Sequence, residues 1–129
     1  MALAPLSTTD RIVNVYLNVA RDALGRPTAF FDGYKTGAPL RHCFRLPLVD
    51  EELNLTPSAL AEKVYHLLNI GDDPAFGSPD ERAVAYRLAL LRSLSVGDVL
   101  EIQGHYLAVA SMGFVSVDAP DRETISMPW

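Results

Sequence analysis

The order of the predicted secondary structure constrains this fold most, because one helical region separates two groups of short strands. Thr56 is a residue type that favours a helix N-cap, and Pro57 suits the first helical position. The apolar residues that follow recur at helical spacing: Leu60, Val64, Leu67 and Leu68. Gly71 can end this helix in a left-handed backbone conformation. A second helix is predicted over residues 83–91, after a capping box that starts at Ser78.

Two strands are predicted before the helices. Residues 11–19 alternate between two faces, and one face is entirely apolar: Val13, Val15, Leu17 and Val19. Residues 40–48 form the second predicted strand. If that strand is regular, one face carries Leu40, His42, Phe44 and Leu46, and the other carries Arg41, Cys43 and Arg45. Between the two strands, Phe30 and Phe31 are expected in a short strand or a packed loop.

Three more strands are predicted after the helices, over residues 99–103, 106–111 and 114–117. Turns at Gly104 and Gly113 separate them at hairpin spacing. The order β-β-α-α-β-β-β is typical of an α+β domain with an antiparallel sheet, whose three C-terminal strands can curl into a small, partly open barrel. The polar run with Pro120 predicts that the sheet ends before residue 118.

Length, charge and cysteine content limit the function classes. A chain of 129 residues predicts one domain, 1–129, with an ordered core at about 11–117 and tails at 1–10 and 118–129. Whether Trp129 docks on the domain is left open. Eleven Lys and Arg against 16 Asp and Glu give a net charge of −5, which argues against broad binding to nucleic-acid phosphates. The single Cys43 excludes an internal disulfide. With no apolar run of about 18 residues, a cytoplasmic location without a membrane partner is expected.

Only in residues 92–102 do the residue types and their spacing suggest a role other than packing in a core. This segment contains Ser93, Ser95, Gly97 and Asp98. One interpretation is a polar pocket at the mouth of a sheet. The favoured interpretation is a loop whose hydroxyls and carboxylate form hydrogen bonds with backbone amides and fix the turn into the next strand. Because no general base stands in this run, neither serine has an activator, and no catalytic residue is predicted.

The histidines and the cysteine do not form a recognisable motif. His42 and Cys43 are adjacent in a predicted strand, so their side chains are expected on opposite faces. Neither His66 nor His105 stands at metal-ligand spacing from another histidine. No glycine-rich phosphate loop occurs. We therefore predict no metal site and no cofactor.

Arg41 and Arg45 are the best basic candidates, since a regular strand places them on one face. With Tyr16, Tyr34 or Phe31 nearby, they could grip a nucleic-acid strand. The favoured interpretation is that they are exposed and pair with the surplus of carboxylates.

Residues 67–74 and 92–99, taken together, carry a resemblance to a known family. They resemble a family of small proteins, without established activity, from actinobacteria and their phages and plasmids. They are distantly similar to the YodL-like accessory domain in polyvalent proteins of mobile elements. The matching positions are Asn69, Ser93, Leu94, Ser95, Gly97, Asp98, Tyr106, Gly113 and Phe114. The resemblance implies a mobile-element setting and no established reaction.

These observations lead to three hypotheses. The first is a non-enzymatic accessory protein of an actinobacterial phage or plasmid, which binds a host or element protein through an apolar sheet face or the edge from Tyr106 to Phe114. The alternative is a nucleic-acid-associated small-barrel module, and a third is an enzyme that uses the turn between Ser93 and Asp98. The provisional binding residues are Ser93, Ser95, Asp98, Tyr106, Phe114, Arg41 and Arg45. A homodimer is also left open.

Overall fold

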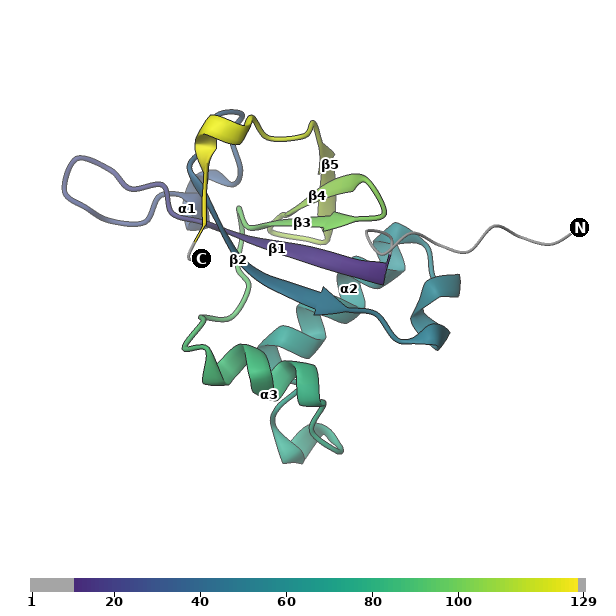
Figure 1. The fold of residues 1–129 in the computed structure, drawn as a ribbon. Coiled ribbons are helices and arrows are strands. Elements are labelled where there is room, and N and C mark those ends of the chain that lie inside the picture. Colours follow the sequence, from purple (N-terminus) through teal and green to yellow (C-terminus); the bar gives the residue numbers. More distant parts are fainter. Residues whose placement is uncertain (1–10, 128–129) are drawn as a thin grey trace, which may run out of the picture.

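The computed structural model describes residues 11–127, which form a mixed sheet with helices on one face (Figure 1). The strands are β1 (Ile12–Asn18), β2 (Leu40–Pro47), β3 (Val99–Ile102), β4 (His105–Val109), β5 (Phe114–Val117) and β6 (Ile125–Ser126). Their order across the sheet is β5-β4-β3-β1-β2-β6. All neighbours are antiparallel except β2 and β6. The α+β prediction is confirmed, and the sheet is open, so the C-terminal strands do not close into a barrel.

Helix α2 (Pro57–Ile70) begins where the sequence predicts, because the Thr56 hydroxyl accepts a hydrogen bond from the Ala59 N–H at 3.2 Å. It is followed by Gly71, whose backbone is right-handed (φ −67°), contrary to the expected left-handed cap. Glycine is required there for space, since a Cβ atom would collide with the Leu67 carbonyl oxygen. The helix end is therefore set by close packing.

Helix α3 (Glu81–Leu88) is shorter and starts differently from the prediction. The predicted capping box at Ser78 is wrong, because the N-cap is Asp80, whose carboxylate accepts a hydrogen bond from the Arg82 N–H at 2.8 Å. The helix does not continue to residue 91, since Leu90 has a positive φ of 61°.

The core lies between the sheet and helices α2 and α3, which cover one of its faces (Figure 1). The predicted apolar face of β1 contributes Val13, Val15 and Leu17, all buried. Tyr86 of α3 is fully buried among them, and its ring meets that of Phe44 edge-on at 5.1 Å. Because this face is inside the protein, it is not the apolar sheet face on which a partner could dock.

A β-bulge changes the face assignment of β2. Val15 is opposite Phe44, but Tyr16 is opposite His42, so Cys43 is an extra residue in the strand. As a result His42 lies on the open face with Tyr16, whereas Phe44 lies on the helix-covered face. The predicted grouping of residues 40–46 is therefore wrong, because one inserted residue shifts the alternation.

The sheet also continues past residue 118, contrary to the prediction. After the 3-10 turn Arg122–Thr124, β6 pairs in parallel with the start of β2, where Leu40 is opposite Ile125. Ile125 packs against a small cluster on the open face that includes Tyr16 and Val99. Apolar packing thus holds this segment on the sheet. The predicted tail at residues 1–10, and Trp129, whose order the sequence left open, lie outside the described residues.

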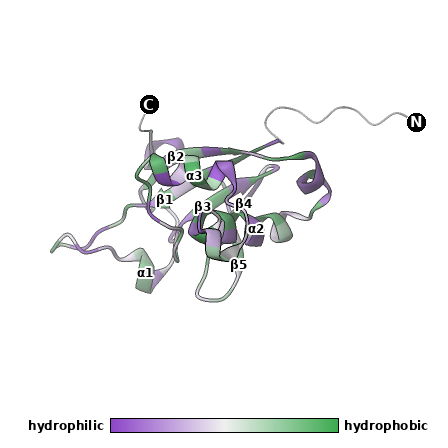
Figure 2. Ribbon diagram, turned by 90° about the horizontal axis from the view of Figure 1, so that it is seen from below, coloured by the Kyte–Doolittle hydropathy of each residue, from purple (hydrophilic) through white to green (hydrophobic). Residues whose placement is uncertain are grey.

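Residues 19–39, called the arm below, connect β1 to β2 and extend beyond the end of the sheet (Figures 1 and 2). A bridge between Arg21 and Pro27 closes the first part of the arm. The second part contains the one-turn helix α1 (Ala29–Asp32). Phe30 and Phe31 therefore lie on an exposed helical turn, and the predicted strand or packed loop is wrong.

Candidate binding site

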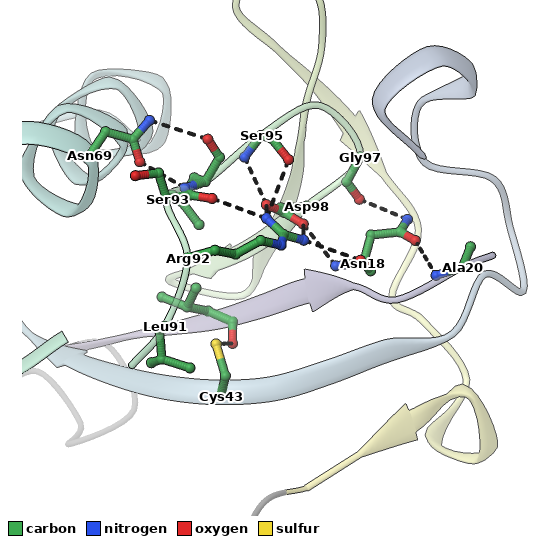
Figure 3. Close-up of polar contacts among 12 residues, drawn as sticks. Asn18, Ala20, Cys43, Asn69, Leu91, Arg92, Ser93, Ser95, Gly97 and Asp98 are labelled. Carbon is green, nitrogen blue, oxygen red and sulfur yellow. Dashed lines mark hydrogen bonds and ion pairs between the residues drawn. The ribbon is translucent and has the colours of Figure 1, made fainter. Parts of the chain in front are cut away.

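The loop of residues 92–98 is built around the carboxylate of Asp98, which is fully buried (Figure 3). Its Oδ1 accepts a hydrogen bond from the Asn18 N–H at 2.8 Å, and its Oδ2 accepts one from the Ser95 N–H at 2.8 Å. The Arg92 guanidinium forms two further bonds to the same carboxylate, at 2.7 and 2.8 Å. This is the geometry of a side chain that fixes a turn.

The same loop is joined to the end of β1 and the start of the arm. Asn18 Nδ2 donates to the Gly97 carbonyl at 3.0 Å, and Asn18 Oδ1 accepts from the Ala20 N–H at 3.0 Å (Figure 3). Arg92 also donates to the Asn18 carbonyl at 3.1 Å. Its hydrogen bonds to Asp98 raise the pKa of Arg92, although burial opposes this shift. The arginine therefore stays charged and paired.

The helices hold the other side of the loop. Asn69, at the end of α2, accepts from the Leu94 N–H at 2.7 Å and donates to the Leu94 carbonyl at 3.2 Å (Figure 3). Tyr86 donates to the Arg92 carbonyl at 2.6 Å. Asn69 and Tyr86 thus fix the loop between the two helices and the sheet.

Neither serine of the loop is placed next to a base. The Ser93 hydroxyl accepts from Arg87 at 3.3 Å, and the Ser95 hydroxyl accepts from Arg92 at 3.3 Å. An arginine cannot remove a proton from a hydroxyl, so these contacts do not create a nucleophile. In residues 11–127 every buried side-chain nitrogen or oxygen has a hydrogen-bond partner.

Gly97 brings the arm against this loop. Its φ is +94°, and a Cβ atom there would lie 2.5 Å from the Cβ of Ala29, the first residue of α1. Only glycine combines this backbone conformation with so close an approach. The position of α1 is therefore set by residues of the 92–98 loop.

A cleft of about 340 Å³ lies between the arm and the loop. Its apolar lining comes mostly from the arm: Val19, Ala20, Pro27, Ala29, Phe30 and Val96. Its polar lining consists of Asn18, Arg21, Arg92 and Ser95. This volume is at the lower end for ligand sites, so the cleft suits a small group or a short piece of peptide.

The arm beside this cleft exposes large apolar side chains. Phe30 is 62% exposed and Phe31 is 84% exposed, and their rings meet edge-on at 5.1 Å. Leu24 is 78% exposed. Sequence reasoning missed this surface. The available signal was two adjacent phenylalanines in a short segment between Pro27 and Gly33, too short to bury both.

The structure brings together only some of the predicted binding residues. Ser93, Ser95 and Asp98 share the 92–98 loop, but Tyr106 and Phe114 lie on opposite faces of the sheet. The register shows this, because Phe114 is opposite Val109, three residues from Tyr106. The predicted edge from Tyr106 to Phe114 is therefore not one surface.

The two predicted arginines are also separated. Arg41 is opposite Leu17 on β1, whereas Arg45 is opposite Asn14, so the bulge puts them on different faces. The prediction that they share a face is wrong for this reason. The shared basic surface on which the nucleic-acid hypothesis depended does not form.

A second polar cluster lies on the open face of the sheet. Asn14 donates to Glu101 at 2.6 Å and contacts His42 Nε2 at 2.9 Å, and Tyr106 donates to Glu101 at 2.6 Å. Burial, and then the bond to Glu101, raises the pKa of Tyr106. Burial, and then Arg45, lowers the pKa of His42. This cluster is a hydrogen-bonded set in which Tyr106 is not poised as a base.

Cys43 and the histidines do not combine into a site. Cys43 lies in the helix-covered core, away from the face of His42, and burial raises the pKa of its thiol to about 11. The thiol is therefore not a nucleophile at neutral pH. Within residues 11–127 no group of three His, Cys, Asp or Glu side chains is placed to hold a metal ion.

Comparisons with known proteins do not assign the chain to a family. No family model, no curated protein and no solved structure matches it. Among the described helices, none has the length and apolar character needed to cross a membrane.

Proposed function

We propose that this chain is a non-enzymatic interaction protein that binds a protein partner through the arm. The observation that carries the proposal is the edge-on pair of Phe30 and Phe31, which are 62% and 84% exposed and of which Phe30 lines the cleft. Adjacent exposed apolar side chains that form a patch mark binding surfaces, and aromatic residues dominate the binding energy of many interfaces. A partner that covers both rings would remove this apolar surface from water.

The hydrogen bonds at the cleft favour binding over catalysis. Asp98 and Arg92 are committed to each other and to backbone groups, and both serine hydroxyls accept from arginines. These bonds fix the loop side of the cleft, which lowers the entropy lost on binding there. A cleft with one fixed side and an exposed aromatic ring on the other is the arrangement expected of a docking site.

The proposal includes a setting. The resemblance of residues 67–74 and 92–99 supports a protein of an actinobacterial phage or plasmid, whose partner belongs to the host or to the element. We also propose a cytoplasmic location, with which the single free thiol of Cys43 is compatible. The nucleic-acid alternative is weaker, because the net charge is −5 and Arg41 and Arg45 lie on different faces.

The test compares two double variants in affinity capture followed by mass spectrometry. Phe30→Ser with Phe31→Ser removes the aromatic pair. The matched control is Leu88→Ser with Leu90→Ser, two leucines that are 77% and 93% exposed at the end of α3. Circular dichroism checks that both variants are folded.

The expected result is a protein that the wild type and the leucine variant capture and the phenylalanine variant does not. Equal capture by both variants, or capture of nucleic acid alone, refutes the proposal. Failure of the wild type to capture any protein does so as well.

A further inference from the structure

The charged side chains that line the cleft are both cationic, although the whole chain has a net charge of −5. They are Arg21, from the arm, and Arg92, from the 92–98 loop. The charge of Arg92 is balanced by the buried carboxylate of Asp98, at 2.7 Å. Arg92 therefore shapes the cleft and offers hydrogen bonds, but it does not supply an unpaired positive charge.

Arg21 differs from Arg92 in this respect. Its guanidinium donates to the Gly25 carbonyl at 2.8 Å, which keeps it folded back along the arm. Within residues 11–127 it forms no ion pair with a carboxylate. The nearby Arg26, by contrast, pairs with Asp22 at 2.8 Å. The cleft thus has one cation that is not neutralised by the described part of the chain.

Apart from Asn18 and Ser95, the rest of the cleft lining is apolar, and the cleft is partly open. Val19 is 41% exposed and Phe30 is 62% exposed, and the other apolar residues of the lining are Ala20, Pro27, Ala29 and Val96. A volume of about 340 Å³ admits one or two residues of a peptide. An apolar wall next to an unneutralised arginine is complementary to an apolar side chain next to a carboxylate.

We infer that the cleft binds a short acidic segment of the protein partner. An apolar side chain of that segment contacts Phe30 and Val96, and an adjacent Asp or Glu carboxylate pairs with Arg21. This inference rests on the proposed function, since it specifies the chemistry of the partner at the same surface. Because Arg21 is exposed, the ion pair strengthens binding of the acidic segment only about two- to fivefold. Its main effect is that acidic segments bind in preference to neutral or basic ones.

The experiment is an NMR titration of the ¹⁵N-labelled full chain with three matched probes. They are acetylated dipeptide amides of leucine followed by glutamate, glutamine or lysine, which differ mainly in charge. The expected result is saturable shifts of the backbone amide signals of Ala20, Arg21 and Val96. The glutamate probe binds most tightly, the glutamine probe about two- to fivefold more weakly, and the lysine probe most weakly.

Two charge-reversal variants control the titration. Arg21→Glu should make the affinities of the three probes equal or reverse their order. Arg122→Glu, the same change in an exposed 3-10 turn outside the cleft, should leave that order unchanged.

The inference is overturned if the three probes bind equally, if their shifts lie outside the cleft, or if no probe shifts any signal. It is also overturned if Arg21→Glu keeps the wild-type order. These failures are separate from failure of the proposed function, which shows as partner capture that survives the loss of both phenylalanines.

Discussion

Replacing Glu52 by glutamine should destabilise the fold in a pH-dependent way, because Glu52 is the centre of an ion cluster. Glu52 lies in the 3-10 helix Asp50–Asn54 after β2 and is 2% exposed. Its carboxylate contacts Arg82 at 2.7 Å and Lys63 at 3.0 Å, and it accepts from the Val49 N–H at 2.9 Å. The cluster joins the end of β2 to α2 and α3, so its loss weakens the contact between sheet and helices.

The magnitude follows from the pKa of Glu52. Burial alone raises this pKa, but the hydrogen bonds from Arg82, the Val49 amide and Lys63 outweigh burial and lower it from 4.5 to about 2. One pKa unit corresponds to about 1.4 kcal/mol, so the shift contributes about 3 kcal/mol to the free energy of unfolding.

The direction of the pH dependence follows from the lowered pKa of Glu52. Between the unfolded and folded pKa values the unfolded chain binds the proton and the folded chain does not. The stabilisation is therefore complete above about pH 5 and is lost as the pH falls from 4.5 through about 2. Near neutral pH the Glu52→Gln variant should be about 3 kcal/mol less stable than the wild type, or about 11 °C lower in Tm.

Urea denaturation followed by circular dichroism measures this difference at several pH values between neutral and acid. The difference in the free energy of unfolding should shrink as the pH falls below 4.5. The matched control is Glu51→Gln, the same change at the neighbouring exposed position, which should alter stability by less than about 0.5 kcal/mol. A difference that does not change with pH, or one below about 1 kcal/mol near neutral pH, would refute the reasoning.

Three other predictions concern the loop and the core. Gly97→Ala should lower the free energy of unfolding more than Gly104→Ala, because both backbones have a positive φ but only the first would collide with Ala29; thermal unfolding of the two variants tests this. Asp98→Asn should cost about 2 kcal/mol in urea denaturation, because its bonds to the Arg92 guanidinium and two backbone amides lose their charge, and an unchanged midpoint would contradict that role. Cys43 should not react with Ellman's reagent in the native protein and should react once the chain is unfolded, since it is 7% exposed and its pKa is about 11; rapid native reaction would contradict this burial.

Local pattern was enough to predict most elements of the fold. The alternation in residues 11–19 predicted β1 and its buried face, and Thr56 with Pro57 predicted the start of α2. These features are local, because backbone geometry repeats every two residues in a strand and the N-cap bond spans three residues. The phase of β2 was not predictable, because the extra residue at Cys43 is defined only by its pairing with β1.

For the candidate site too, local sequence predicted some features and only the tertiary structure determined the others. The sequence by itself predicted that residues 92–98 form a turn in which the Asp98 carboxylate accepts from backbone amides, since serine, glycine and aspartate favour such turns for local reasons. The predicted bonds from the serine hydroxyls to backbone amides are wrong, because both hydroxyls accept from arginine side chains. Only the tertiary structure decided that Asp98 accepts from Asn18, 80 residues earlier, and that Gly97 seats the arm against the loop. The exposure of Phe30 and Phe31 was decided there too, because burial depends on which segments meet at the end of β1. Turn chemistry acts within a few residues, whereas a cleft forms only where distant segments of the chain pack together.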